Sequence, residues 1–82
     1  MKKSPLAGKN NLIGPRIRQI RRAQRLWQNE LAGKLAAQGI SIDRTAITKI
    51  ENQTRGVLDY EAVAIAKALE VSVAGLFGEK SG

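Results

Sequence analysis

The sequence predicts an all-α fold with five short helices in one small domain. Apolar residues recur three and four positions apart, which is the spacing of one buried helix face. No segment alternates polar and apolar residues with the two-residue period of a strand. Cap-forming and turn-forming residues separate the periodic stretches, and a length of 82 residues is that of a single domain.

The first helix is expected over residues 14–25, because Pro15 suits the first helical position. Ile17 and Ile20 would face the core, and Arg21 would lie at the edge of that apolar stripe. The opposite side of the helix carries Arg18, Arg22 and Arg25.

The second helix is expected over residues 28–37, with Leu31 and Leu35 buried. Gly39 is the kind of residue that usually follows a helix end. The turn over residues 38–42 is longer than the usual three or four residues between two such helices. This length leaves the register of the next helix open by one position.

The third helix is expected over residues 44–52, and Asp43 is a suitable N-cap for it. Ala46, Ile47 and Ile50 share one face that can be buried. The other face carries hydrogen-bond donors and hydroxyl groups without an acid: Arg44, Thr45, Thr48, Lys49 and Asn52. A face of this kind can lie in the major groove of DNA and contact base edges.

Two further helices follow the loop over residues 53–58. Asp59 is expected to cap a fourth helix over residues 60–69. The inward residues of that helix would be Val63, Ala66 and Leu69, joined by Ala62 or Ile65. A fifth helix is expected over residues 73–77, and the core would be closed by Val71, Val73, Leu76 and Phe77.

These helices define the expected domain limits. Residues 1–12 are polar and basic without periodicity, so we expect a flexible N-terminal arm. Residues 13–78 would form the folded domain, and residues 79–82 a short C-terminal tail.

The composition excludes several classes of function. The chain has no cysteine and no histidine, which rules out disulfides, zinc sites with these ligands and Cys or His nucleophile–base pairs. Its acids are scattered without a paired site, so we expect no enzyme activity, no metal and no cofactor. No apolar run approaches the roughly 20 residues needed to span a bilayer. We therefore expect a cytoplasmic protein without membrane contact, and the lack of cysteine fits a reducing compartment.

The net charge of +7 is unevenly distributed. Residues 1–25 contain lysines and arginines but no acid, whereas both signs occur in the remainder. Charge alone is equally compatible with a polyanionic partner and with a role in solubility.

Four segments in a fixed order carry a resemblance to a known family. They are Ile17 to Arg21, Gln28-Asn29-Glu30-Leu31-Ala32, Ile47-Thr48-Lys49-Ile50-Glu51-Asn52, and the stretch from Ile65 to Phe77. Together they resemble the phage-repressor/Cro-type (XRE-like) helix-turn-helix family over about residues 13–78. The resemblance implies a compact five-helix, lambda-repressor-like DNA-binding domain whose second and third helices form the helix-turn-helix.

The resemblance also implies roles for individual residues. Base-reading positions map to Arg44, Thr45, Thr48, Lys49 and Gln28. Phosphate-binding positions map to Asn52, Gln53, Thr54 and Arg55. The family pairs the positions of Arg21 and Glu51 in an ion pair between the first and third helices.

The implied function is sequence-specific binding of double-stranded DNA by a transcriptional regulator, a repressor that reads a near-palindromic operator as a homodimer. The dimer surface would lie near Val73, Leu76 and Phe77, although these residues could equally complete the core. The alternative is an antitoxin-like or other module that binds a protein partner with the same fold. RNA binding is disfavoured, because the one tyrosine and one phenylalanine lie in no RNA-stacking motif.

Two residues depart from the family pattern. Trp27 stands where the family usually has Ser, Thr or Asn to cap the second helix, and tryptophan cannot cap in that way. We expect it to pack in the core rather than to stack on the sugar–phosphate backbone. Gln53 replaces the common glycine after the third helix, so that helix could extend slightly.

Overall fold

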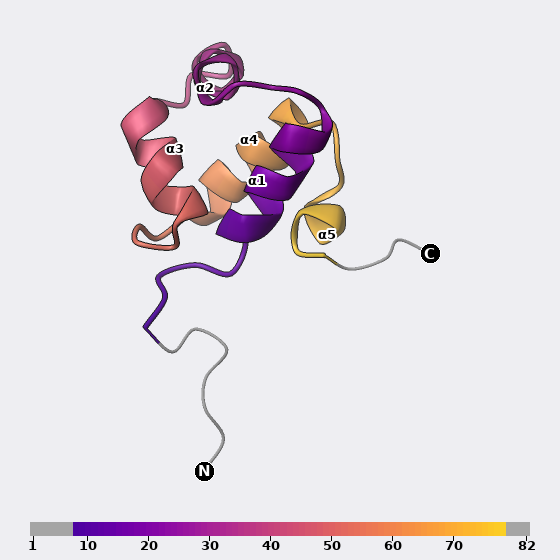
Figure 1. Ribbon diagram of the computed structural model, residues 1–82. Helices are drawn as coiled ribbons and strands as arrows, with labels where there is room; N and C mark the ends of the chain where they lie inside the picture. Colours follow the sequence, from indigo (N-terminus) through magenta and orange to yellow (C-terminus); the bar gives the residue numbers. More distant parts are fainter. Residues whose placement is uncertain (1–7, 79–82) are drawn as a thin grey trace.

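The computed structural model describes residues 8–78, and these residues form five α-helices and no strand. In chain order they are α1 (Gly14–Ala23), α2 (Gln28–Ala36), α3 (Arg44–Glu51), α4 (Asp59–Ala68) and α5 (Val73–Leu76) (Figure 1). The expected all-α, five-helix architecture is confirmed. Most of the expected N-terminal arm and the tail over residues 79–82 lie outside the described residues.

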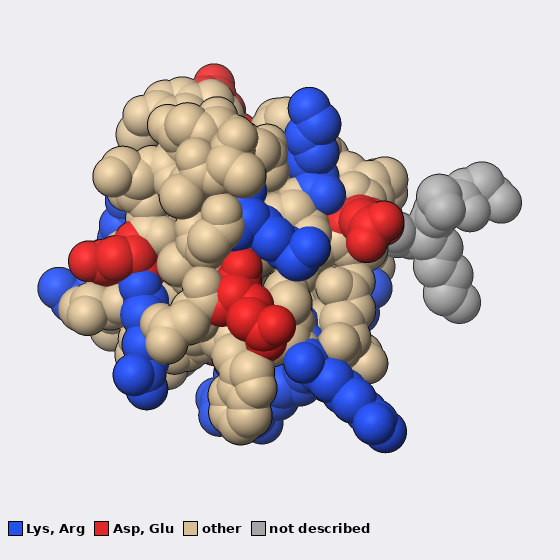
Figure 2. Space-filling view, turned by 90° about the horizontal axis from the view of Figure 1, so that it is seen from above, with Lys and Arg blue, Asp and Glu red and all other residues tan. Residues whose placement is uncertain are grey.

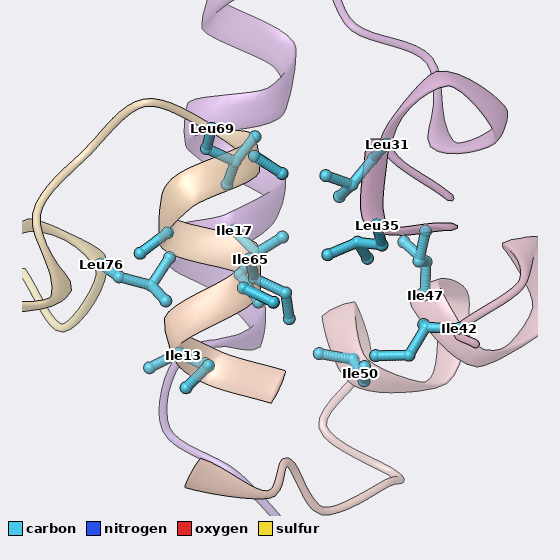
Figure 3. Packing of buried hydrophobic residues seen from close by; sticks show 14 of the residues in the cluster. Ile13, Ile17, Leu31, Leu35, Ile42, Ile47, Ile50, Ile65, Leu69 and Leu76 are labelled. Carbon is cyan, nitrogen blue, oxygen red and sulfur yellow. The ribbon is translucent and has the colours of Figure 1, made fainter. Parts of the chain in front are cut away.

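The helices pack around one apolar core. α1 contacts α3, α2 contacts both α3 and α4, and α5 packs on α4. Side chains from all five helices meet in the middle of the molecule (Figure 3). The largest fully buried ones are Ile17, Leu31, Leu35, Ile50, Ile65, Leu69 and Leu76. Each such side chain stabilises the fold by roughly 1.5–3 kcal/mol relative to an exposed one.

A cap after the long turn fixes the register of α3. The chain leaves α2 through Gly39, whose φ of 79° lies in the left-handed region. Ile42 is buried in the core, which anchors the end of the turn. Asp43 Oδ1 then accepts a hydrogen bond from the Ala46 amide at 2.8 Å, so that α3 begins at Arg44 as expected.

The end of α3 is sharper than expected. Gln53 adopts a φ of 64°, and its amide donates to the Ile50 carbonyl at 3.0 Å. The helix therefore stops at Glu51 and does not extend through the loop. A left-handed conformation costs roughly 1–2 kcal/mol for a non-glycine residue. The Gln53 side chain offsets part of this cost by donating to the Asn11 carbonyl at 3.0 Å.

The start of α4 differs from the expectation. Asp59 is the first residue of the helix rather than its cap, and the N-cap position belongs to Leu58. The Glu61 carboxylate accepts a hydrogen bond from the Leu58 amide at 2.9 Å, which satisfies a donor at the helix start. The prediction of an inward Val63 is also wrong, since this side chain is 54% exposed. It lies about 160° around the helix from Ile65, which is buried.

Three more residues that were expected in the core are exposed. Trp27 is 75% exposed because Leu26, the residue before it, packs against the core at this point. In α5 the short helix directs Leu76 inward, whereas Val73 and Phe77 are 43% and 49% exposed. The core is thus closed by Leu76 and the partly buried Val71. The prediction of a core position is wrong for Trp27, Val73 and Phe77.

The folded part of the chain begins before α1. Asn11 is buried, and its Nδ2 donates to the carbonyls of Ile50 and Arg55 at 3.0 and 2.7 Å. Its Oδ1 accepts from the Gly14 amide at 2.7 Å. The Asn10 amide donates to the Gln53 carbonyl at 2.9 Å. Both asparagines therefore bind the end of the expected N-terminal arm to the loop after α3.

Candidate nucleic-acid interface

The exposed face of α3 forms one wall of a groove. The groove has a volume of about 920 Å³ and lies between the end of α1, the start of α2 and α3. Its lining includes Arg18, Arg22, Arg25, Trp27, Gln28, Arg44, Thr48 and Asn52. Basic and uncharged polar side chains thus dominate this concave surface.

The expected two-faced character of α3 is present in the structure. Ile47 and Ile50 are almost completely buried, and they hold the helix against the core. All four residues that the sequence assigns to base reading on this helix are exposed: Arg44, Thr45, Thr48 and Lys49. The structure therefore places these donors and hydroxyls on one outward-facing surface of α3.

A buried ion pair joins α1 to the end of α3. Arg21 Nε donates to Glu51 Oε2 at 2.7 Å, and Arg21 Nη2 donates to Glu51 Oε1 at 3.1 Å. The remaining guanidinium nitrogen, Nη1, donates to the Leu26 carbonyl at 2.9 Å. Both side chains are at least nine-tenths buried. The pair holds Glu51 in one position, on the side of α3 that faces α1.

Two more hydrogen bonds extend this pair to the surface. Gln28 Nε2 donates to Glu51 Oε1 at 3.1 Å, and the Thr48 hydroxyl lies 3.1 Å from Gln28 Oε1. A carboxylate paired with arginine can only accept, so the nitrogen of the Gln28 amide must face Glu51. The amide oxygen then faces Thr48, and the Thr48 hydroxyl must be the donor.

The polarity of the Thr48 hydroxyl follows from its neighbours. Its other partner within reach is the Arg44 carbonyl at 3.1 Å, which is also an acceptor. The single proton of the hydroxyl is therefore used inside the protein with either partner. Only the lone pairs of Thr48 Oγ1 remain for an external molecule.

The loop after α3 contains the residues that the sequence assigns to phosphate binding. Asn52 and Thr54 are exposed, whereas the Gln53 side chain is bound to the Asn11 carbonyl. Arg55 forms two hydrogen bonds of 3.1 Å to the Glu61 carboxylate. Its guanidinium is therefore engaged with α4, and the geometry favours a structural role for Arg55.

The Arg55–Glu61 pair changes the titration of the carboxyl group. The hydrogen bond from Arg55 lowers the pKa of Glu61 below its ordinary value of 4.5. Burial of the carboxyl acts in the opposite direction but is outweighed. Glu61 thus stays ionised at neutral pH and accepts from both Arg55 and the Leu58 amide.

Sequence reasoning missed the role of the two asparagines before α1. Asn10 Nδ2 donates to the Thr54 carbonyl at 3.1 Å, which adds to the contacts of Asn11 with the same loop. A local signal was available, because Asn11 stands three residues before Gly14, and asparagine favours this position for a side-chain bond to the backbone. The contact with a loop about 40 residues away had no such signal.

Charges of both signs occur on other parts of the surface. Figure 2 looks down on the end of the molecule that carries α2, and blue basic and red acidic side chains both project from this face. The groove beside α3 is different, since Glu51 is its one acidic lining residue within the described part of the chain, and Arg21 neutralises it.

Comparison with solved structures identifies similar proteins. The restriction-modification controller protein C.AhdI from Aeromonas hydrophila has 31% sequence identity and a TM-score of 0.69, over 79% of this chain and 87% of that chain. The P22 c2 repressor protein, solved in complex with synthetic operator 9T in the presence of Tl⁺, has 26% identity and a TM-score of 0.68. That alignment covers 85% of this chain and 98% of the repressor chain. No protein-family model and no curated protein matches the sequence.

The fold and these likenesses define a class, that of compact five-helix domains in which α2 and α3 form a helix-turn-helix. The chain belongs to the phage-repressor/Cro-type helix-turn-helix family. The two similar proteins are a controller and a repressor rather than enzymes, in agreement with the expected lack of enzyme activity.

Two further features of the described residues concern membrane spans and metal sites. Among residues 8–78, no helix has the length and apolar character needed to cross a bilayer. The same part of the chain has no group of three or more acidic, histidine or cysteine side chains placed to hold a metal ion.

Proposed function

We propose that this protein is a sequence-specific regulator of transcription that binds double-stranded DNA with α3 in the major groove. The observation that carries the proposal is the exposed face of α3, which presents Arg44, Thr45, Thr48 and Lys49 in one direction. Ile47 and the Arg21–Glu51 pair fix the helix behind it. The crystal structure of the similar P22 c2 repressor with a synthetic operator supports the same use of this fold.

The donor and acceptor character of α3 suggests which bases it reads. Arg44 and Lys49 carry only donors, which match the O6 and N7 acceptors of guanine. Thr48 Oγ1 has its proton bound internally, so it is matched to a base amino group, N6 of adenine or N4 of cytosine. Gln28 keeps one free amide N–H beside Thr48 for a base or phosphate oxygen.

Phosphate contacts would fix the position of α3 on the duplex. Backbone amides at the start of α2 and the exposed side chains of Asn52 and Thr54 are suited to this role. Arg55 uses three of its five N–H donors on Glu61 and the Gly56 carbonyl, so we assign it first to the support of the loop. Its Nε–H and second Nη2–H remain for a phosphate oxygen.

A homodimer that represses transcription is the form in which we expect the protein to act. Two copies would place their α3 helices about 34 Å apart on a near-palindromic site. Leu76 cannot contribute to a dimer surface because it is completely buried. We assign the contact to exposed Val73, the first residue of α5, and to exposed Phe77, which directly follows this helix.

A protein partner is the second candidate, and one observation favours it. Leu58, Tyr60 and Val63 expose apolar surface at the start of α4. This surface lies outside the groove beside α3, so a protein contact here and DNA binding are compatible.

In vitro selection of duplexes from a random pool tests the proposal. We expect enrichment of a short site in wild-type protein, and loss of preference at one base position in Arg44→Ala, worth roughly 1–3 kcal/mol. Arg16→Ala is the matched control, because Arg16 donates to the Gly75 carbonyl on α5 and lies away from α3. Failure of the wild-type protein to enrich any duplex would refute sequence-specific DNA binding and favour the protein partner.

A further inference from the structure

We propose that the end of α1 provides a second contact with DNA, an arginine ridge formed by Arg18 and Arg22 on the helix and Arg25 just after it. The ridge binds phosphates flanking the bases read by α3. This inference rests on the proposed function, and it extends the contact beyond α3 and the start of α2. The partner chemistry is the sugar–phosphate backbone of the same duplex, without regard to its sequence.

The position of the ridge supports this assignment. Arg18 and Arg22 are four residues apart, which puts them on one side of α1, and Arg25 lies two residues beyond the end of this helix. All three are exposed, and all three line the same groove as Arg44, Thr48 and Asn52. A duplex seated against α3 would therefore have the ridge along the opposite wall of the groove.

The ridge differs from the remaining arginines of α1. Arg21 is paired with Glu51, and Arg16 donates to the Gly75 carbonyl and to Gln19 Oε1. Arg18, Arg22 and Arg25 have no ion pair within residues 8–78. Three guanidinium groups on one wall are therefore available to anions, whereas their neighbours are used to hold the fold.

The arginine ridge destabilises the protein in the absence of DNA. Like charges four residues apart, as in Arg18 and Arg22, destabilise a helix. Arg25 adds the cost of a left-handed conformation, with a φ of 56° at a helix end where glycine would be unstrained. A bound polyanion would relieve the repulsion, and solubility alone does not require the charges to be gathered along one groove.

Salt dependence provides a quantitative test. Each phosphate that a protein neutralises adds about 0.9 to the slope of log K against log [salt] on duplex DNA. Loss of two such contacts should make this slope shallower, with its magnitude reduced by about 1.8. We expect this change in Arg18→Gln/Arg22→Gln, both on the duplex chosen by selection and on a mixed-sequence duplex of equal length.

The experiment compares this double variant with Arg16→Gln, which removes the same kind of charge from the other side of α1. Binding is followed by fluorescence of Trp27, the one tryptophan of the chain, which lines the groove. The selected duplex is shortened from its ends in steps. Wild type and Arg16→Gln should lose affinity as the flanks are removed, whereas the double variant should bind long and short duplexes about equally.

The outcomes separate the ridge from the proposed function. A double variant with the wild-type salt slope and flank dependence would overturn the ridge, although the base preference of α3 would still stand. Absence of any sequence preference in the wild-type protein would instead overturn the proposed function. Circular dichroism checks the fold, and Arg25→Gly supplies a second variant that relieves backbone strain. It should lower the slope by about 0.9 with no loss of thermal stability, and an unchanged slope would count against the ridge.

Discussion

Removal of the Glu51 carboxylate should strongly destabilise the fold. Glu51 is buried and accepts three hydrogen bonds, two from Arg21 and one from Gln28. In Glu51→Ala the buried guanidinium keeps only its bond to the Leu26 carbonyl. Breaking a buried pair in this way costs about 3–5 kcal/mol, because the remaining charge is desolvated without a partner.

This cost is large for a domain of this size. At roughly 0.05–0.15 kcal/mol per residue, the total stability of such a chain is about 4–12 kcal/mol. A loss of 3–5 kcal/mol lowers Tm by roughly 12–40 °C, since about 1 kcal/mol corresponds to 4–8 °C in domains of this length. Thermal melts followed by circular dichroism at neutral pH measure the shift directly.

A double variant separates the lost pair from the lost volume. Arg21→Met/Glu51→Leu replaces both charges with apolar side chains of similar size, and we expect it to recover most of the stability. Glu51→Gln keeps the shape of the side chain and should fall between the wild type and Glu51→Ala. A Tm for Glu51→Ala within a few degrees of the wild type would show that the pair does not hold α3, and the reasoning would fail.

Two further predictions concern base preference and pH. Thr48→Val removes the acceptor but keeps the shape, so selection should lose its preference at one base pair, by about 0.5–1.5 kcal/mol. Thr45→Val should leave that base pair unchanged, and a Thr48→Val variant that still selects the wild-type base there would contradict the assigned role of Thr48 as an acceptor. The pKa of Glu61 is lower in the folded protein than in the unfolded chain, where it is 4.5, so the unfolded chain binds more protons between the two pKa values. The stability that ionised Glu61 provides is therefore present above pH 4.5 and is lost as the pH falls through the folded pKa. Glu61→Gln should therefore show a shallower fall of Tm between about pH 5 and pH 3 than wild type or the exposed-site control Glu70→Gln, and parallel curves would argue against the Arg55 pair as the cause.

The expectations that succeeded are those set by local periodicity and capping. Ile17, Leu31, Ile47 and Ile50 recur at helical spacing and are all buried. The Asp43 side chain caps the first turn of α3 and so fixes where the helix begins, and the long turn before it did not shift the register of α3. These signals act within about one helical turn and can be read from a few neighbouring residues.

The expectations that failed depend on which surface a side chain meets in three dimensions. Trp27 and Val63 are apolar, yet no helix lies over them, and hydrophobicity alone cannot report that. No local pattern predicts the pairing of Arg55 with Glu61, because this pairing follows from the way the loop folds back on α4. The contacts of Asn11 with the loop after α3 arise from the closure of about 40 residues, which no local pattern encodes.

The chain of hydrogen bonds from Arg21 to Thr48 connects stability with recognition. Arg21 makes Glu51 an obligate acceptor, Glu51 orients the Gln28 amide, and that amide sets the direction of the Thr48 hydroxyl. A threonine hydroxyl alone can donate to a base or accept from one. A charge buried in the core therefore removes one of these two options at the surface, so the donor and acceptor pattern of α3 depends on residues that never contact DNA.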